Sequence, residues 1–182
     1  MLRCIVITGG PGSGKTTLID ALAAGGLSTM PEAGRAIIRQ QQAIEGQALP
    51  WVDPAAYAAQ MLGWELRSFQ EAELCSGPVF FDRGIPDIIG YLRLIGLPVP
   101  DHLMRAARLH RYQEPVFLAP FWPEIYGKDL ERRQGLAEAE ATGLEMARIY
   151  AELGYATVIL PRAPVEERVA FLLQEEKPRR VK

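Results

Sequence analysis

Residues 9–17 constrain the fold more than any other part of the chain, because they read Gly-Gly-Pro-Gly-Ser-Gly-Lys-Thr-Thr. This run fits the pattern G-x-x-x-x-G-K-[ST], in which a glycine-rich backbone approaches a phosphate chain closely. The fixed positions of the pattern are Gly9, Gly14, Lys15 and Thr16. The apolar run 2–8 before the loop predicts a buried strand, and residues 15–24 after it predict a helix. Strand, loop and helix in this order are the sequence signature of a P-loop.

The chemistry of this loop predicts that the chain binds a nucleoside triphosphate. Loop amides and the N-terminus of the following helix supply positive potential for phosphate oxygens. Lys15 would reach the outer phosphates, and the hydroxyl of Thr16 would ligate Mg²⁺. We therefore expect ATP and Mg²⁺ as cofactors, held by Gly9, Gly10, Pro11, Gly12, Ser13, Gly14, Lys15, Thr16 and Thr17. The chain contains no asparagine and so lacks the guanine-reading motif N-K-x-D, which disfavours a Ras-like GTPase. The preference for ATP or GTP stays undecided.

Short apolar runs alternate with helical stretches along the rest of the chain, which is typical of a parallel α/β sheet. Strands are predicted at residues 2–8, 27–31, 78–82, 115–119 and 155–160. Helices are predicted at residues 15–24, 54–74, 88–95, 101–111, 128–153 and 164–174. Asp53 followed by Pro54 is a good start for the second helix. With 182 residues we expect a single domain, 1–182, with a lid within about 120–150.

Composition and charge exclude several classes of partner. The formal net charge is −2, which argues against a surface that wraps nucleic acid. No apolar run approaches the roughly 18 residues of a membrane span, and the N-terminus leads straight into a strand, so we expect neither a membrane anchor nor a signal peptide. Cys4 and Cys75 have no spacing typical of a metal site or a disulfide framework, which favours a reducing cytoplasm. The sequence leaves open whether the protein forms a homodimer.

Asp82 and Arg83 directly follow the apolar run Val79-Phe80-Phe81. In open α/β sheets the ligand lies beyond the carboxyl ends of the strands, so polar residues at those ends are candidates for chemistry. Asp82 would support Mg²⁺ or a bound water, and Arg83 could clamp a phosphate or carboxylate of an acceptor. The alternative is an aspartate that merely starts a turn at Gly84.

Glu32 and Arg35 follow the predicted strand 27–31 in the same way. Glu32 would face the cleft beside the loop, where its carboxylate could accept a proton from an attacking hydroxyl. Arg35 lies one helical turn further on, and we assign Glu32, Arg35 and Arg83 to substrate binding. The alternative is a surface Glu–Arg pair near the start of a helix.

Arg132 and Arg133 lie inside the charged helix predicted at 128–153. Paired arginines on a mobile segment can close over a triphosphate and stabilise the charge of the transition state. We therefore predict that one of the two contacts phosphate, without a basis for choosing between them. The alternative is a solvated helix face, which most charge runs are.

Weaker signals come from residues near the predicted strand ends. Asp87 could join an acceptor site, although the cap of the helix 88–95 is the interpretation we favour. Phe121 and Trp122 could stack on a ligand, although covering the edge of the core is the simpler explanation. Arg162 follows the last predicted strand, where loops often border a nucleotide base, but it could equally be a plain surface residue.

Four segments together resemble a known family: residues 9–17, Pro31-Glu32-Ala33-Gly34-Arg35, Phe81-Asp82-Arg83-Gly84 and Val165-Glu166-Glu167-Arg168-Val169. They resemble the small AAA-type ATPase and kinase-like P-loop family, which includes the ribosylnicotinamide kinase domain of bacterial NAD-biosynthesis proteins. The resemblance to deoxynucleoside and thymidylate kinases is more distant. It implies a three-layer α/β/α P-loop NTPase fold, with a five-stranded parallel sheet in the order 2-3-1-4-5 and a helical arginine lid.

The resemblance also implies roles for individual residues. Lys15 and Thr16 match the ligands of phosphate and Mg²⁺. Asp82 matches the carboxylate of the family's Asp-Arg motif, and Arg83 its phosphate- or acceptor-binding arginine. Glu32 matches the carboxylate that serves as base in deoxynucleoside kinases. The Pro and Trp that follow that base in deoxynucleoside kinases are missing here, so their nucleoside pocket is not implied. Arg132 and Arg133 match the lid arginines only by position and charge.

These observations leave two functions from different classes. The first is a phosphotransferase that moves the γ-phosphate of ATP to a small nucleoside- or nucleotide-like acceptor. The second is an ATPase or nucleotide-dependent regulatory protein without a small-molecule acceptor, whose product is a conformational state. These motifs do not identify the acceptor.

Overall fold

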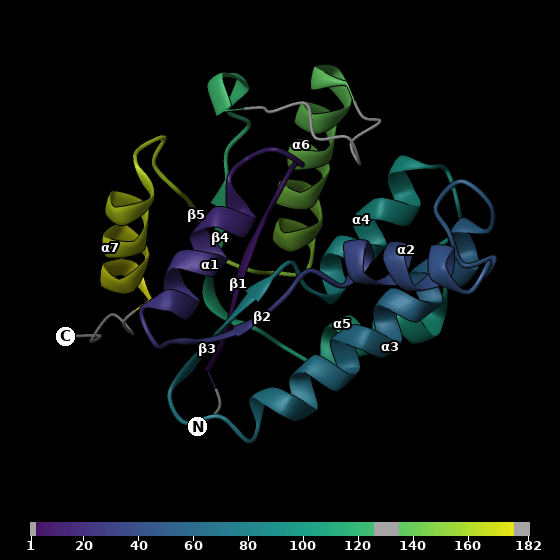
Figure 1. Ribbon diagram of the computed structural model, residues 1–182, viewed down its shortest axis with the longest axis horizontal. Helices are drawn as coiled ribbons and strands as arrows, with labels where there is room; N and C mark the ends of the chain where they lie inside the picture. The colour runs from purple at the N-terminus through teal and green to yellow at the C-terminus, as the bar shows by residue number, and fades with distance from the viewer. Residues whose placement is uncertain (1–2, 126–134, 177–182) are drawn as a thin grey trace.

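The computed structural model describes residues 3–125 and 135–176 and contains one sheet of five parallel strands (Figure 1). The strands are β1 (Arg3–Gly9), β2 (Ser28–Met30), β3 (Pro78–Asp82), β4 (Gln113–Ala119) and β5 (Thr157–Ile159). They lie in the order β2-β3-β1-β4-β5, and each adjacent pair is parallel. The predicted sheet order is therefore confirmed.

Seven α-helices surround the sheet within the described residues. They are α1 (Lys15–Ala24), α2 (Ala33–Ala43), α3 (Pro54–Ala72), α4 (Ile85–Leu94), α5 (Asp101–Leu109), α6 (Leu136–Glu152) and α7 (Val165–Glu175). A short 3₁₀ helix, η1 (Pro123–Ile125), follows β4. The predicted cap of α3 is confirmed, because the Asp53 side chain accepts a hydrogen bond from the Ala56 amide at 2.9 Å.

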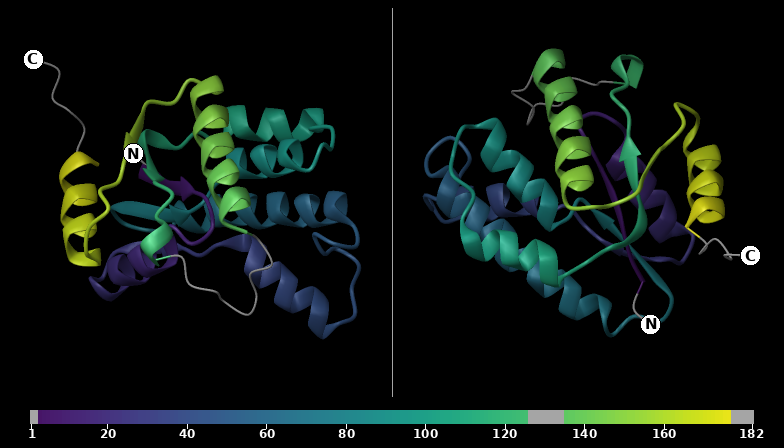
Figure 2. Two further views of the ribbon diagram at one scale, coloured as in Figure 1. Left: turned by 90° about the horizontal axis from the view of Figure 1, so that it is seen from above. Right: turned by 180° about the vertical axis from the view of Figure 1, so that it is seen from behind.

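Alternating residues of β1 divide the core between the two faces of the sheet. Cys4 and Val6 point into a cluster formed with α3, α4, α5 and α6. Ile5 and Ile7 point the other way, into a cluster formed with α1 and α7. Figure 2 shows the same separation of the helices across the sheet. This is the three-layer α/β/α arrangement expected for the fold, and it follows from the two-residue period of a strand that is buried on both faces.

Helix α2 lies beside α3, beyond the edge of the sheet. Ala33 and Ile37 pack against Tyr57 there. The helices predicted from the sequence leave this segment out, whereas the structure forms α2 from Ala33 to Ala43. The buried Gln41 explains the compact turn that follows, because its side-chain oxygen accepts the amide of Ala48 at 3.1 Å.

The register brings the carboxyl ends of three strands to one edge of the sheet. Ile7 of β1 pairs with Asp82 of β3, and Met30 of β2 pairs with Phe81. The phosphate loop, Glu32 and Arg83 all follow directly from these ends. The candidate residues from three separate motifs therefore converge where ligands bind in open α/β sheets, beyond the carboxyl ends of the strands. None of the described helices is both long and apolar enough to cross a membrane.

Candidate active site

The glycines of the phosphate loop adopt backbone conformations that other residues rarely reach. Gly12 and Gly14 both have φ of 73°, in the left-handed region. Gly9 has φ of 135°, and a Cβ atom there would lie 2.3 Å from the Ala119 carbonyl oxygen of β4. The loop thus turns sharply between β1 and α1 while its backbone packs closely against the neighbouring strand.

Lys15, the first residue of α1, is buried under the loop. Its Nζ donates to the carbonyl oxygens of Gly10 and Gly9 at 2.7 and 3.1 Å and to Ser13 Oγ at 3.2 Å. Burial, aided by the nearby positive charge of Arg83, lowers the pKa of Lys15 to about 7. An anionic phosphate would favour the charged form of this amine, so phosphate binding and protonation of Lys15 reinforce each other.

Asp82 ends β3 beside Lys15 and carries an unsatisfied oxygen. Its Oδ1 atom is buried and has no hydrogen-bond partner among the described residues. Burial, then the charge of Glu32, raises the pKa of Asp82 to about 6. A buried carboxylate oxygen without a donor fits a cation or a cation-bound water, and Mg²⁺ in phosphate sites typically uses one or two protein oxygens. Thr16, the other predicted ligand, lies exposed at the start of α1.

No group of three or more His, Cys, Asp or Glu residues suited to a metal occurs in the described part of the chain.

Glu32 forms ion pairs with two arginines at the mouth of the site. Arg83 Nε lies 3.0 Å from Glu32 Oε1, and Arg35 Nε lies 3.3 Å from Oε2. Burial alone would raise the pKa of Glu32, but the charges of Arg83, Lys15 and Arg35 outweigh it and hold the pKa below its ordinary value. The structure therefore brings together Glu32, Arg35 and Arg83. The Glu32 carboxylate is ionised at neutral pH and can accept hydrogen bonds.

Asp87, for which we favoured a helix cap, accepts hydrogen bonds from four groups. The cap is present, because Asp87 Oδ2 accepts the Gly84 amide at 3.1 Å. The same carboxylate also accepts the Thr8 hydroxyl at 2.5 Å, Arg83 Nη1 at 3.1 Å and the Tyr150 hydroxyl at 2.8 Å. The interpretation as a cap alone is thus incomplete, since Asp87 links β1, Arg83 and α6.

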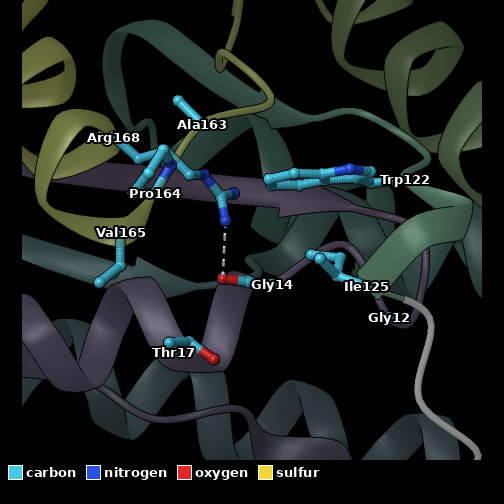
Figure 3. A pocket seen from close by; sticks show the side chains of 9 residues that line it. All are labelled: Gly12, Gly14, Thr17, Trp122, Ile125, Ala163, Pro164, Val165 and Arg168. Carbon is cyan, nitrogen blue, oxygen red and sulfur yellow. Dashed lines mark hydrogen bonds between the residues drawn. The ribbon is translucent and has the colours of Figure 1, made fainter.

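A pocket of about 400 Å³ opens on the other side of the phosphate loop (Figure 3). Trp122 and Ile125 lie on one side of it, and Arg168 and the start of α7 lie on the other. Gly12, Gly14 and Thr17 form its floor. Trp122, which we expected to cover the edge of the core, therefore lines this pocket. This position supports the alternative that Trp122 stacks on a ligand.

Arg168 is the functional candidate that sequence reasoning did not assign. It comes from α7, yet its Nη1 and Nη2 donate to the carbonyl oxygens of Gly14 and Ser13 at 3.1 and 3.2 Å. A signal for it existed, because Val165, Arg168 and Leu172 share one face of α7 and that face is otherwise apolar. A charged residue on the buried face of a helix requires a partner, which here is the phosphate loop.

Several predicted residues lie elsewhere. Arg132 and Arg133 lie outside the described residues, so their contact with phosphate stays a prediction, as does the lid within about 120–150. Within that range, α6 packs against the sheet and α4 through its buried residues Met146 and Ile149. Arg162 is exposed and donates to the Phe121 carbonyl at 2.8 Å, which holds the two loops that flank the pocket together.

The comparisons with solved structures agree with this geometry at the level of the fold. Two crystal structures of NadR protein, one in complex with NR and one with NAD and AMP-PNP, superpose with TM-scores of 0.73 and 0.69 at 18% and 17% identity. They cover 99% of this chain and 53% and 51% of the NadR chains, so the chain spans about half their length.

Two kinases match over nearly the whole of both chains. A deoxyadenosine kinase from M. mycoides gives a TM-score of 0.65 at 13% identity, covering 94% of this chain and 97% of its own. A thymidylate kinase from Ehrlichia chaffeensis gives 0.61 at 15%, with the same coverage. At these identities the likeness shows the fold alone, which is that of the P-loop kinases.

Sequence comparison identifies the family directly. No curated protein matches the chain. A sequence model of the AAA domain family, however, matches residues 4–168, from the first strand to the arginine that reaches back to the phosphate loop. Since this match covers nearly the whole chain, the protein belongs to the AAA domain family and has the P-loop kinase-like fold.

Proposed function

We propose that the protein is a phosphotransferase that moves the γ-phosphate of ATP to a hydroxyl or phosphate of a small nucleoside- or nucleotide-like acceptor. One observation carries the proposal: the ion pair of Glu32 with Arg83 lies at the same sheet edge as Lys15 and Asp82. A protein that only hydrolyses or senses ATP has no need for a partly buried carboxylate–guanidinium pair at that point. A phosphotransferase needs one to hold and orient its acceptor.

The pocket beside Trp122 and the phosphate loop together support one direction for the bound nucleotide. A base stacked on Trp122 would place its phosphates along the loop amides from Gly12 to Lys15. The γ-phosphate would then lie at the far end of the loop, toward Asp82 and Glu32. Thr16 and Asp82 would hold Mg²⁺, which supplies charge neutralisation to the phosphates when it is bound.

The acceptor would bind on the opposite side of the γ-phosphate, against Glu32. Its hydroxyl would donate a hydrogen bond to the Glu32 carboxylate, which then takes the proton as the phosphate is transferred. Arg83 and Arg35 keep that carboxylate ionised and fix its direction. Tyr57 and Tyr91, in edge-to-face contact with ring centroids 5.6 Å apart, are placed to form an apolar wall beside it. Arg132 and Arg133 would close over the phosphates and exclude water.

The proposal is tested by incubating the protein with γ-labelled ATP and Mg²⁺ against a panel of nucleosides, nucleotides and vitamins. We expect label to move to at least one acceptor. Glu32→Gln should reduce transfer by at least about a hundredfold while ATP affinity is retained. Glu71→Gln, the same change in the exposed surface pair with Arg67, is the matched control and should leave transfer unchanged. Hydrolysis without an acceptor and no labelled product across the panel would instead support the ATPase alternative.

A further inference from the structure

We propose that Asp87 and Tyr150 are positioning residues for the candidate active site: together they hold Arg83 in the orientation in which it binds Glu32. The proposal rests on the proposed function only in that Glu32 is taken as the acceptor's base. The hydrogen bonds described for the two side chains all go to protein groups, so we expect both to act through Arg83.

The first argument is the number and origin of the groups that bind Asp87. Its Oδ1 accepts from Thr8 Oγ1 of β1 and from Arg83 Nη1, and its Oδ2 accepts from the Gly84 amide and from Tyr150 Oη of α6. A helix cap requires only the Gly84 bond. The other three donors come from the central strand, from the arginine of the site and from a helix 63 positions further along the chain.

The second argument is the conformation of Arg83. Its φ of 73° places it in the left-handed region, which a residue with a long side chain rarely adopts. Such a conformation persists only where the surroundings fix it. Here the guanidinium is fixed by three acceptors, namely the Gly9 carbonyl at 3.0 Å, Asp87 Oδ1 at 3.1 Å and Glu32 Oε1 at 3.0 Å.

The third argument is the cost of removing one member of this network. Tyr150 is fully buried, and its hydroxyl donates to Asp87. Without that donor, Asp87 Oδ2 would keep only the Gly84 amide in a site that excludes water. Because unsatisfied buried groups are expensive, the carboxylate would shift or rotate, and Arg83 would lose the anion that holds Nη1. The chain Tyr150–Asp87–Arg83–Glu32 thus connects α6 to the candidate base.

The experiment uses three variants of the full chain. Tyr150→Phe removes one donor. Asp87→Asn replaces one carboxylate oxygen, which accepts hydrogen bonds, with an amide NH₂ group, which can only donate them. Tyr155→Phe is the matched control, because Tyr155 is also buried and packs edge-to-face on Tyr150, but its hydroxyl accepts only the Tyr112 amide at 3.2 Å among the described hydrogen bonds. The first measurement is solvent exchange of the Arg83 Nε–H proton by NMR, assigned by its loss in Arg83→Lys.

The expected result is exchange at least about tenfold faster in Tyr150→Phe and Asp87→Asn, since losing the Asp87 anchor frees the Nε–H bond to Glu32. Tyr155→Phe should match the unmodified protein. The second measurement is steady-state ATP turnover, in which kcat should fall about tenfold in the first two variants while KM for ATP stays within about twofold. A fall in kcat with an unchanged KM would indicate that Glu32 is misplaced, whereas a disordered nucleotide site would also raise KM for ATP.

Slow exchange of the Arg83 proton in both Tyr150→Phe and Asp87→Asn would overturn the proposal, and so would equally fast exchange in Tyr155→Phe. Should Asp87→Asn fail to fold, Tyr150→Phe alone decides, because it removes a single hydroxyl. If the unmodified protein turns over no ATP, the proposed function fails, while the exchange measurement still decides whether Asp87 and Tyr150 hold Arg83.

Discussion

Arg168 Nη1 donates a hydrogen bond to the carbonyl oxygen of Gly14 at 3.1 Å, joining the last helix to the phosphate loop. A second bond runs from Nη2 to Ser13 at 3.2 Å. Both acceptors belong to backbone that turns through left-handed conformations, so the guanidinium fixes the loop from outside. The helix that ends the described chain is therefore part of the candidate nucleotide site.

Arg168→Ala should lower the free energy of unfolding by about 2–4 kcal/mol, because two charge-assisted hydrogen bonds and a buried stem are lost. The Kd for ATP should rise about tenfold, since the loop is no longer held in place before the nucleotide binds. Urea denaturation and calorimetric titration measure the two effects. Arg108→Ala, at an exposed position of α5, should change neither. An Arg168→Ala protein that binds ATP with unchanged affinity would contradict the role of Arg168 in the site.

Lys15→Met should abolish ATP binding and also change how stability depends on pH. Burial lowers the pKa of Lys15 in the folded protein to about 7, against 10.5 when unperturbed. Between these values the unfolded chain binds more protons, so this residue makes the free energy of unfolding rise with pH from about 7 to about 10. Denaturation at several pH values should show that slope in the unmodified protein and a flatter curve in Lys15→Met. Equal slopes would show that Lys15 titrates normally in the fold.

The strands and the phosphate loop could be predicted because their signals are local. Val79, Phe80 and Phe81 form a short apolar run ended by a polar residue, and the loop glycines stand at fixed spacing. The order of the sheet is not local, since each short parallel strand could occupy any position. It was implied by the resemblance to a family rather than by the residues themselves.

The partners of Asp87 and Arg168 could not be predicted, because they depend on contacts between distant parts of the chain. The cap of α4 was visible in the sequence, but Thr8 and Tyr150 lie 79 and 63 positions from Asp87. The acceptors of Arg168 are backbone carbonyls, which leave no trace in a pattern of side chains. In contrast, the contact between Glu32 and Arg83 is predictable from the family resemblance, since the sheet order that it implies places the strands before these two residues side by side.

Glu65→Gln should stabilise the protein increasingly as pH rises above about 4.5. Burial, then the charges of Asp87 and Asp82, raises the pKa of Glu65 well above its ordinary value, and its Oε2 has no partner in the described structure. Above about pH 4.5 the folded protein therefore binds more protons than the unfolded chain, so this residue makes the free energy of unfolding fall as pH rises.

Glutamine does not titrate, so the stability difference between Glu65→Gln and the unmodified protein should be small at pH 4.5 and larger at pH 8. Chemical denaturation at the two pH values measures it. Glu71→Gln, the same change at an exposed position of α3, is the matched control. A constant difference across pH would show that Glu65 is ionised in the fold.

Trp122→Phe should weaken the fluorescence response of the protein to ATP. Trp122 lines the pocket in which we place the base, whereas Trp51 precedes α3 and Trp64 lies within α3, and neither lines that pocket. Stacking of a base on the indole should quench its emission, and that part of the response is lost in the variant. Trp122→Ala should in addition raise the Kd for ATP by about tenfold, because one stacked aromatic contributes roughly 1–3 kcal/mol. Unchanged quenching in Trp122→Phe would place the base elsewhere.

Gly10→Ala should destabilise the contact between the phosphate loop and α6. A Cβ atom at Gly10 would lie 2.1 Å from the Ala139 carbonyl oxygen, and backbone cannot yield as a flexible side chain can. We expect a loss of about 1–3 kcal/mol in the free energy of unfolding, together with weaker ATP binding. The matched control is Gly63→Ala in α3, where a Cβ atom meets nothing within 4 Å. That variant should gain about 0.5–1 kcal/mol, since alanine is the better helix former. Thermal and urea denaturation of the two variants measure the difference in stability. A Gly10→Ala protein as stable as Gly63→Ala would mean that α6 does not pack closely against the phosphate loop.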